Sequence, residues 1–457
     1  MSQRLTSFSA EQLLPTLISL PAAGSWLVGL SGGADSTALL HTLVQLKEQL
    51  NTPFRAVHVN HGLHPDSNQW QQHCETLCQQ WSVPLTCIDV QITRTGQGLE
   101  AEAREKRYAA IASILQADEA LLTAHHQDDQ AETLLLNLMR GSGVDGLSAM
   151  PASKQFGDKQ LFRPLLNSNH QALLDYLSSN QIKWIEDPSN QNIDQDRNFI
   201  RNSLLPLLEK QFSGATKRLL LTQQAMAESR TLLESMADRQ IKDSLLHSQV
   251  LSLSDELLDN PALFKLTIRH WLKKNAVASL PNRQLNDLCN QLQHVTSGSQ
   301  TSVRWAGTCL RFYQNCLWLQ KNPEVAACEQ IDWPENQTSL ELNQPLGTLS
   351  LVSDKPIKLP GAISVSNRTR HFGLSLDRGN HHQSLKNLFQ SASVPVWLRD
   401  CIPLLLIDDQ LAAVGDWATS KSFASWLSQN HVKFTWQPGA PLLQYLTQQQ
   451  RHRARLT

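Results

Sequence analysis

Several features are missing from this chain of 457 residues, and each absence excludes a class of protein. There is no Cys-x-x-Cys pair, and the 8 cysteines are irregularly spaced, which argues against a disulfide framework in a chain of this length. No apolar run approaches the roughly 20 residues of a membrane span, and the first residues lack the apolar core of a signal peptide. We therefore predict a cytoplasmic protein that contacts no membrane.

An excess of charge of either sign is also missing. The chain has 40 lysines and arginines against 41 aspartates and glutamates, which gives a net charge of -1. It therefore lacks the overall basic character typical of nucleic-acid-binding proteins. Basic residues gather only locally, at Lys217-Arg218, at Lys273-Lys274 and in the tail Arg451–Arg455. Such runs are usually solvated surface, and the tail is a candidate for phosphate contact.

What is present begins with a turn rich in glycine and serine near the N-terminus. Ser31, Gly32, Gly33, Ala34, Asp35 and Ser36 follow the apolar run Trp26–Leu30 and lead into an amphipathic helix. This layout brings free backbone N–H groups and a helix N-terminus to one place, and both attract phosphate. Ser36 is expected to cap the helix or to donate to a phosphate oxygen.

The same turn lacks the Gly-Lys-Ser/Thr ending of a Walker loop, so no lysine reaches a terminal phosphate. A loop without that lysine suits holding pyrophosphate as a leaving group better than transferring the last phosphoryl group. The alternative is a tight strand-to-helix turn that binds nothing, and the added serines and aspartate count against it.

Strand-like and helix-like segments alternate through the first 211 residues. The predicted strands are 26–30, 54–60, 85–90 and 120–124, and the predicted helices are 36–50, 67–81, 99–116 and 129–140. This alternation predicts an α/β domain with a parallel sheet covered by helices, in which the ligand binds at the carboxyl ends of the strands.

The remainder of the chain predicts two further domains. A long helix over 215–246 precedes helices at 253–275 and 281–293 and strands at 302–305 and 308–320. Residues 321–345 hold three prolines among polar residues and are interpreted as a linker. Strands at 346–352 and 402–407 with a helix at 384–391 follow. The predicted boundaries are 1–214 for the α/β domain, 215–325 for a mainly helical domain and 345–457 for a small α+β domain.

A second polar cluster follows the fourth predicted strand, starting at His125 and His126. Asp128 and Glu132 are four residues apart, so a helix places both carboxylates on one face. A cation between them relieves their repulsion, and Mg²⁺ takes one or two carboxylates plus substrate phosphates. The alternative is acidic capping of the helix, which does not account for the two histidines.

Other polar clusters lie in the same domain. His58 and Asn60 end a predicted strand, and Arg104 stands four residues after Glu100, a spacing typical of a surface ion pair. Arg197 and Arg201 share a helical face, where two guanidinium groups could bind phosphate or carboxylate. His73, Cys74 and Cys78 lack the spacing of zinc ligands, and buried cysteines are the favoured interpretation.

Taken together, these clusters carry a resemblance to a known family. The chain resembles the PP-loop ATP pyrophosphatase superfamily through Ser31–Ser36, and within it the tRNA(Ile)-lysidine synthetase family. The second resemblance depends on the order and spacing of His58–Leu63, Glu102–Tyr108, His125–Thr133, Arg140–Leu147, Arg163–Leu166, Glu186–Asn190 and Arg197–Asn202.

The resemblance implies a Rossmann-like PP-loop ATPase domain, followed by a helical substrate domain and a small α+β C-terminal domain. It implies a two-step reaction that uses ATP and Mg²⁺ on the isoleucine tRNA with a CAU anticodon. Oxygen 2 of the wobble cytidine attacks the α-phosphorus of ATP and releases pyrophosphate, and the amine of free L-lysine then displaces AMP. A homodimer is also expected from the resemblance.

The resemblance also assigns roles to residues. The loop Ser31–Ser36 with His58, Asn60 and His125 is expected to bind ATP, and Asp35 with Asp128 is expected to bind Mg²⁺. The expected catalytic set is Asp35, Glu132, Arg104 and Arg201. In it the two arginines stabilise the adenylate or orient the base, and Glu132 binds the lysine ammonium or takes its proton. The sequence leaves open how metal and lysine duties divide between Asp128 and Glu132.

Two other functions share part of this pattern. A tRNA thiolase uses cysteines near its active site, and this chain has none at matching positions. A non-catalytic RNA-binding protein on the same fold would not need both the Ser31–Ser36 loop and the His125–Thr133 cluster.

Overall fold

The structure is a computed structural model that describes residues 8–62, 64–91, 99–293, 301–321, 330–343, 346–367, 375–377 and 382–456. The chain divides into two compact units, Met1–Leu233 and Glu234–Thr457. Among the described helices, none has both the length and the apolar character that crossing a bilayer requires.

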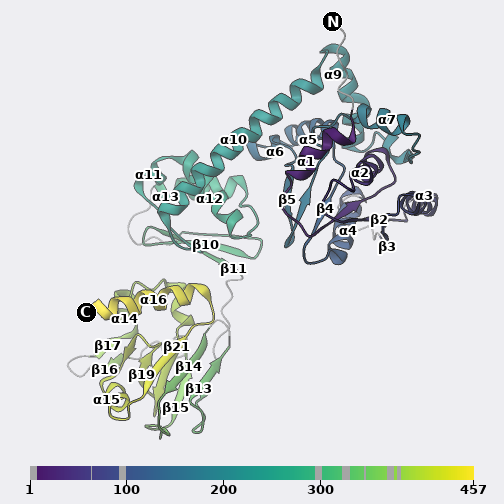
Figure 1. The fold of residues 1–457 in the computed structure, drawn as a ribbon. Helices are drawn as coiled ribbons and strands as arrows, with labels where there is room; N and C mark the ends of the chain where they lie inside the picture. The colour runs from purple at the N-terminus through teal and green to yellow at the C-terminus, as the bar shows by residue number, and fades with distance from the viewer. Residues whose placement is uncertain are drawn as a thin grey trace. The chain divides into compact units, whose positions relative to one another are not determined.

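Unit 1 is built on a six-stranded sheet (Figure 1). Its strands are β1 (Ser25–Gly29), β2 (Phe54–Asn60), β3 (Leu85–Asp89), β4 (Glu119–Leu122), β5 (Ser153–Phe156) and β6 (Lys159–Phe162). Their order is β3-β2-β1-β4-β6-β5, and every neighbouring pair is parallel except the edge hairpin of β5 and β6. The predicted parallel sheet is confirmed, whereas the antiparallel edge strand was not predicted.

Helices cover both faces of this sheet because successive side chains of a strand point to opposite sides. Trp26 and Val28 of β1 join a core with residues of α1 (Ala10–Ile18), α2 (Ala34–Gln45), α3 (Ser67–Gln80) and α7 (His170–Ser179). Leu27, between them in sequence, packs in another core with Ile111 of α4 (Leu99–Ile114). Buried on both faces, β1 is apolar throughout its middle.

A third small core packs α5 (Gln127–Met139) against the last helical segments of the first 211 residues. Ala131 and Leu135 of α5 pack with Ile200 and Leu205. These last residues belong to a continuous helical stretch of α8 (Asp196–Phe199), a π-helical turn (Ile200–Leu204) and α9 (Leu205–Gln211). The packing fixes α5 relative to the arginines of that stretch.

The strand order changes direction at β1, which makes this strand a topological switch point. The chain runs from β1 outward to β2 and β3, then returns to the other side of β1 to form β4. Loops that leave the carboxyl ends of β1 and β4 therefore diverge, and such a switch point is where open α/β sheets bind ligands. Ser31–Ser36 follows β1 and His125 follows β4, so both predicted clusters lie at this switch point.

Helix α10 (Ala215–Ser244) begins in unit 1 and ends in unit 2. Unit 2 continues with three helices, α11 (Asp255–Asp259), α12 (Pro261–Lys274) and α13 (Asn282–Gln293). They pack on a five-stranded sheet of β7 (Leu245–His247), β8 (Val250–Ser252), β9 (Ser302–Trp305), β10 (Thr308–Tyr313) and β11 (Cys316–Lys321). The predicted helix over 253–275 is interrupted at Asn260, which caps α12 ahead of Pro261. The predicted strand over 308–320 is a hairpin that turns at Gln314 and Asn315, both at positive φ.

A second core in unit 2 gathers the C-terminal elements. One sheet contains β12 (Ile331–Asp332), β15 (Ile363–Ser366), β18 (Leu404–Ile407), β19 (Gln410–Val414) and β20 (Ala418–Thr419), and another contains β13 (Ser339–Leu342), β14 (Gly347–Val352) and β21 (Lys433–Gln437). A two-stranded sheet of β16 (Ser375–Asp377) and β17 (His382–Ser384) lies beside α14 (Leu385–Ser391), and a 3-10 helix (Val396–Cys401), α15 (Lys421–Gln429) and α16 (Pro441–Leu456) complete the unit.

The interpretation of 321–345 as a linker is wrong for its second half. Strand β13 pairs with β14, and Trp333, Leu340 and Leu342 are buried in the C-terminal core. Three prolines suggested a linker, but the alternation of buried leucines with exposed residues in β13 is the stronger signal. The division into three domains at 214, 325 and 345 stays a prediction.

Candidate active site

The loop after β1 leaves the N-terminus of α2 without a capping side chain among the described residues. The N-cap is Gly33, and Thr37 is the first residue whose N–H bonds back to it, at 3.1 Å from the Gly33 carbonyl. The N–H groups of Ala34, Asp35 and Ser36 therefore have no acceptor within the helix. Together with the helix dipole they form a site suited to an anion such as phosphate.

The serines of the loop bond to the loop itself. The Ser36 hydroxyl donates to the Gly33 carbonyl at 3.1 Å, and it accepts the N–H of Ser31 at 3.1 Å. The Ser31 hydroxyl lies 3.0 Å from Ser36 Oγ and accepts the N–H of Gly33 at 3.3 Å. In the structure Ser36 therefore stiffens the loop instead of capping α2, and its side chain is nearly fully buried.

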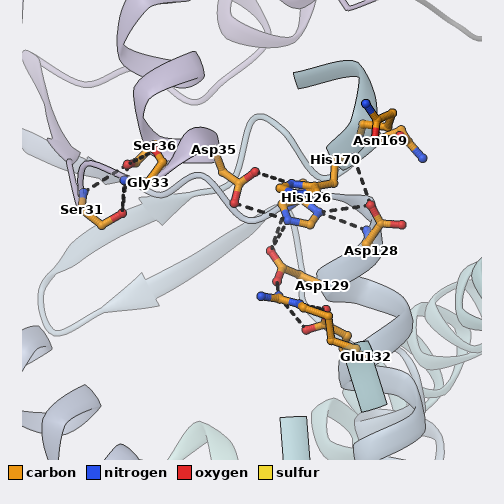
Figure 2. Close-up of polar contacts among 12 residues, drawn as sticks. Ser31, Gly33, Asp35, Ser36, His126, Asp128, Asp129, Glu132, Asn169 and His170 are labelled. Carbon is orange, nitrogen blue, oxygen red and sulfur yellow. Dashed lines mark hydrogen bonds and ion pairs between the residues drawn. The ribbon is translucent and has the colours of Figure 1, made fainter. Parts of the chain in front are cut away.

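Two histidines hold the carboxylate of Asp35 (Figure 2). His170 Nδ1 lies 2.8 Å from Asp35 Oδ1, and His126 Nε2 lies 3.5 Å from Asp35 Oδ2. The two imidazole rings stack at a centroid distance of 4.9 Å. Asp35 comes from α2, His126 is the N-cap of α5 and His170 begins α7, so three elements meet at this point.

The charges of this cluster stabilise one another. Burial alone would raise the pKa of Asp35, but hydrogen bonds from His126 and His170 reverse that effect and hold the pKa well below its usual value. Burial opposes the charged form of His126, yet the hydrogen bond to Asp35 and the charge of Asp129 raise its pKa. A negative carboxylate is therefore maintained beside the open N-terminus of α2.

Asp128 belongs to the same cluster. Its Oδ2 accepts the backbone N–H of His170 at 3.0 Å and lies 3.6 Å from His126 Nδ1. Its own N–H is capped by His126 Nδ1 at 3.2 Å. The structure thus brings Asp128 to Asp35 through His126 and His170, although the sequence grouped it with Glu132.

Glu132 lies in a different group, with Asp129, Arg197 and Arg201. Arg197 Nε and Arg201 Nε donate to the Glu132 carboxylate at 2.8 Å and 2.5 Å. Both arginines also donate through Nη2 to Asp129 Oδ1, at 2.8 Å and 3.0 Å. Glu132 is 1% exposed, so each buried carboxylate is compensated by two guanidinium groups. Arg197 and Arg201 therefore bind carboxylates of the chain itself, and their binding of a phosphate or carboxylate of a ligand stays a prediction.

Asp129 connects the two groups. Its Oδ2 accepts the backbone N–H of His126 at 3.0 Å in a reciprocal capping box, while its Oδ1 faces the arginines. Figure 2 shows the resulting row from Asp35 through His126 and Asp129 to Glu132. Acidic capping of α5 is thus present at Asp129, alongside the histidine cluster.

Each of the remaining predicted ATP-binding residues has hydrogen-bond partners of its own. His58 Nδ1 lies 3.0 Å from the carbonyl of Leu30, directly before the loop. Asn60 accepts the N–H of Gly62 and donates to Asn68 and Gln71, so it organises its own turn. His125 Nδ1 lies 3.0 Å from Thr123 Oγ1, and burial lowers the pKa of His125 to about 3.

Arg104 is exposed on α4 and lies 5.1 Å from the centroid of the Tyr108 ring. Its positive charge makes a small contribution to the lowered pKa of His125, for which burial is the main cause. The side chain of its predicted partner Glu100 lies outside the described residues, as do the side chains of the basic tail Arg451–Arg455.

Sequence reasoning missed His170, and it did not predict that Asp129 and Glu132 are the partners of Arg197 and Arg201. His170 follows the Arg163–Leu166 motif by only a few residues, but nothing in its own neighbourhood singles it out. Arg197 and Arg201 were expected to share one helical face. Asp129 and Glu132, three residues apart, also share a face of their helix, and this spacing could have indicated them as the partners of the arginines.

The donor groups fit Mg²⁺ only in part. Mg²⁺ prefers oxygen ligands and often takes one or two carboxylates with substrate phosphates. The carboxylate of Asp35 is about one-third exposed beside the anion-binding N-terminus, and Asp128 supplies a second carboxylate in the same cluster. The two imidazoles on Asp35 are not ligands that Mg²⁺ favours.

Three family models match this chain. One described as a PP-loop domain covers residues 5–208, one described as a TilS substrate binding domain covers 260–318, and one described as a TilS substrate C-terminal domain covers 363–436. The first supports the Rossmann-like PP-loop fold that the sequence predicted for the N-terminal part.

Curated relatives are similar along nearly the whole chain. A tRNA(Ile)-lysidine synthase of Alkalilimnicola ehrlichii is 36% identical, over 91% of this chain and 95% of the relative. A tRNA(Ile)-lysidine synthase of Shigella flexneri is 38% identical, over 90% of this chain and 96% of the relative. Among solved structures, a U34-tRNA thiolase from Methanococcus maripaludis matches with a TM-score of 0.41 and 18% identity, over 48% of this chain and 78% of that one.

Proposed function

This chain belongs to the tRNA(Ile)-lysidine synthase family, and from that membership we propose how its residues divide the work of the reaction. The activity is ATP-dependent formation of a carbon–nitrogen bond on a tRNA. The cytidine at the wobble position of the CAU-anticodon isoleucine tRNA is adenylated, and the amine of free L-lysine then replaces AMP. The two alternative functions, a tRNA thiolase and a non-catalytic RNA-binding protein on the same fold, are not favoured.

The open N-terminus of α2 is proposed to hold the pyrophosphate part of ATP. Three backbone N–H groups without intrahelical acceptors converge there, and the internal bonds of Ser31 and Ser36 keep the loop in shape before ATP arrives. Donors that are already oriented stabilise the charge that develops on the leaving group. His58 and Asn60 on β2 and His125 after β4 are proposed to complete the nucleotide pocket, because these two strands flank β1.

Asp35 and Asp128 are proposed to hold Mg²⁺ with the phosphates of ATP. When bound there, Mg²⁺ neutralises charge on the phosphate oxygens. The contribution of the chain is a carboxylate on Asp35 that is kept ionised by His126 and His170 and placed one residue inside the phosphate-binding N-terminus.

Glu132 is proposed to act on the lysine substrate. The sequence could not divide the roles of Asp128 and Glu132, and the separation of their contacts supports giving the metal to Asp128 and the ammonium group to Glu132. A carboxylate has about four acceptor lone pairs, and three guanidinium N–H groups of Arg197 and Arg201 donate to Glu132, which leaves a position for the lysine ammonium group. Arg201, partly exposed at the rim of this group, and Arg104 are proposed to face the adenylate.

One observation carries this division, namely the row of polar contacts from Asp35 to Glu132 along the start of α5. It supports a nucleotide-binding end at Asp35 on α2 and a substrate-binding end at Glu132 on α5, connected through His126 at the N-cap of α5. Such an arrangement suits a reaction in which one intermediate is made at the first end and consumed at the second.

The test separates the two steps. The purified protein is incubated with ATP, Mg²⁺, bulk bacterial tRNA and labelled lysine, and AMP release and lysine incorporation are both measured. The wild-type chain should transfer lysine into the CAU-anticodon isoleucine tRNA alone. Glu132→Gln should reduce lysine incorporation more than AMP release, whereas Asp35→Asn should abolish both.

Two results would contradict the division. AMP release without lysine incorporation by the wild-type chain would refute the activity itself. An equal loss of both steps in Glu132→Gln, in a protein that keeps its far-ultraviolet circular dichroism, would refute the assignment of Glu132. The expected homodimer is proposed on the resemblance alone, and sedimentation equilibrium measures it.

A further inference from the structure

We propose that Asp35, His126 and His170 form a binding site for a divalent cation of the zinc class, distinct in its ligands from a Mg²⁺ site. Each residue offers one ligand atom, and the three atoms all lie within 4.8 Å of one another. Among the described residues, no other group of three histidines, cysteines or carboxylates converges in this way.

The position of the three ligands suits a preformed site. They come from the start of α2, the N-cap of α5 and the start of α7, which are held by the cores around the sheet. His126 is 4% exposed in its side chain, whereas Asp35 and His170 are 32% and 42% exposed. The cluster is therefore closed on the His126 side and open on the His170 side, which leaves a coordination position for water or a ligand.

The chemistry of the ligands selects the class of ion. Two imidazole nitrogens and a carboxylate oxygen are typical ligands of Zn²⁺, and Co²⁺ and Ni²⁺ bind similar sets. Mg²⁺ binds oxygen ligands and gains little from imidazole. A cation of the zinc class should therefore bind this chain in the absence of ATP, whereas Mg²⁺ needs the phosphates of the nucleotide.

Asp128 supplies the outer contacts that such a site requires. A histidine that binds metal through Nε2 carries its proton on Nδ1, and a nearby carboxylate usually accepts that proton's hydrogen bond. Asp128 Oδ2 lies 3.6 Å from His126 Nδ1 and is itself held by the N–H of His170 at 3.0 Å. Metal binding then replaces the present bond from the Asp128 N–H to His126 Nδ1 with a bond from Nδ1–H to the Asp128 carboxylate.

The site has a consequence for the reaction. A zinc-class ion would occupy the Asp35 carboxylate that the proposed function assigns to Mg²⁺. Zinc should therefore compete with Mg²⁺, and a trace of it should inhibit the enzyme. The existence of the site does not depend on that function, because binding needs neither ATP nor tRNA.

The experiment measures Zn²⁺ affinity on the full-length protein by competition with a chromogenic chelator, without nucleotide or tRNA. We expect one tight ion per chain, a loss of affinity of at least about 10-fold in His170→Ala, and a loss of about 10-fold in Asp128→Asn. His270→Ala is the matched control, because His270 Nε2 pairs with Asp238 at 2.9 Å and the described residues add no third ligand to this pair. Its affinity should equal that of the wild type.

Cobalt substitution identifies the ligands. The Co²⁺ complex of the wild type should show the visible bands of a nitrogen–oxygen site, and these should weaken in His170→Ala. Equal Zn²⁺ affinity in wild type and His170→Ala, or a thiolate-to-cobalt charge-transfer band, would overturn the proposal. If His170→Ala fails to fold, His170→Gln replaces it, because glutamine suits the helix and supplies no imidazole.

Discussion

At the scale of the residue, the neighbours of a side chain decide its chemical state more than its own identity does. Asp35 and Glu132 are both carboxylates near the start of a helix or within its first turns, but histidines hold one and arginines hold the other. Both oxygens of each carboxylate have partners, but imidazoles can bind a metal together with the carboxylate, whereas guanidinium groups only donate hydrogen bonds to it. The two acids are therefore suited to different steps.

Asp35→Asn tests the first of these residues. Asparagine keeps the size of the side chain but removes the charge that the metal and both histidines require. Pyrophosphate release should fall by at least about 100-fold, in line with the loss of a preorganised electrostatic contact. Asp158→Asn, the same change at an exposed turn between β5 and β6, is the control and should keep full activity. Retention of activity in Asp35→Asn would remove Asp35 from the catalytic set.

His125 gives a prediction about pH and stability. Burial, with Arg163 and Arg197 nearby, lowers its pKa to about 3 although the charge of Asp129 opposes this, whereas an unfolded histidine titrates near about 6.5. Between these values the unfolded chain binds more protons, so the free energy of unfolding decreases as the pH falls below about 6.5. At about pH 5 this loss amounts to roughly 2 kcal/mol.

The variant His125→Asn removes the contribution of His125 to the pH dependence of the free energy of unfolding. Its urea midpoint should therefore decrease less than that of the wild type between about pH 7 and about pH 5. Parallel pH profiles for the two proteins would show that His125 is not kept neutral in the folded state.

At the scale of the element, the loop after β1 depends on a segment far away in sequence. Ile185 donates its N–H to the Gly32 carbonyl at 2.9 Å, and its side chain covers the Gly32 backbone. Gly32 has a φ of +85°, and a Cβ there would lie 2.5 Å from Ile185 Cδ1 and 3.1 Å from Cys74 Sγ. The glycine is needed both for its conformation and for this close approach.

Gly32→Ala should therefore cost about 2–4 kcal/mol of stability and weaken ATP binding, through backbone strain and overpacking together. Gly157→Ala is the matched control, because its φ of +62° imposes similar strain while no atom lies within 4 Å of the new Cβ. It should cost only about 1–2 kcal/mol. Urea denaturation measures the loss of stability, and isothermal titration with ATP measures the loss of binding. Adding Ile185→Ala to Gly32→Ala should restore part of both. Equal effects of the two glycine variants would show that Ile185 does not constrain the loop.

At the scale of the whole molecule, two units with separate cores imply two unfolding events. The apolar clusters around the sheet of unit 1 contain no residue of unit 2. A ligand that binds only one unit stabilises that unit alone, by about 2.7 kcal/mol at a concentration 100 times its Kd. Saturating ATP should therefore shift one thermal transition and leave the other in place.

Calorimetry and tryptophan fluorescence together assign the transitions. Unit 1 holds Trp26, Trp70, Trp81 and Trp184, and the other 8 of the 12 tryptophans lie in unit 2. Fluorescence should follow mainly the transition that ATP does not move, whereas calorimetry should record both. A single transition that ATP shifts as a whole, seen alike by both probes, would show that the units unfold together.

The sequence predicted most of unit 1 because its signals are local. Strands β2 and β3 and the helices α3 and α5 lie within a few residues of their predicted bounds, since apolar runs and polar strand ends repeat regularly there. The prediction was wrong where a local signal misled, as at 331–342, where prolines concealed the buried strand β13. The anion-binding role of Ser31–Ser36 and the roles of Arg104, Asp128 and Glu132 stay predictions.

By itself, the sequence determined the family, the parallel sheet and the loop that follows β1, because motif order and periodicity are properties of neighbouring residues. Only the tertiary structure decided which side chains meet. His170 reaches Asp35 across 135 positions, and Arg197 and Arg201 reach Glu132 across 65 and 69. The first contact depends on how α2 and α7 pack against each other, and the other two depend on the packing of α8 and the π-helical turn against α5. No local pattern encodes the distance between two elements once they have packed.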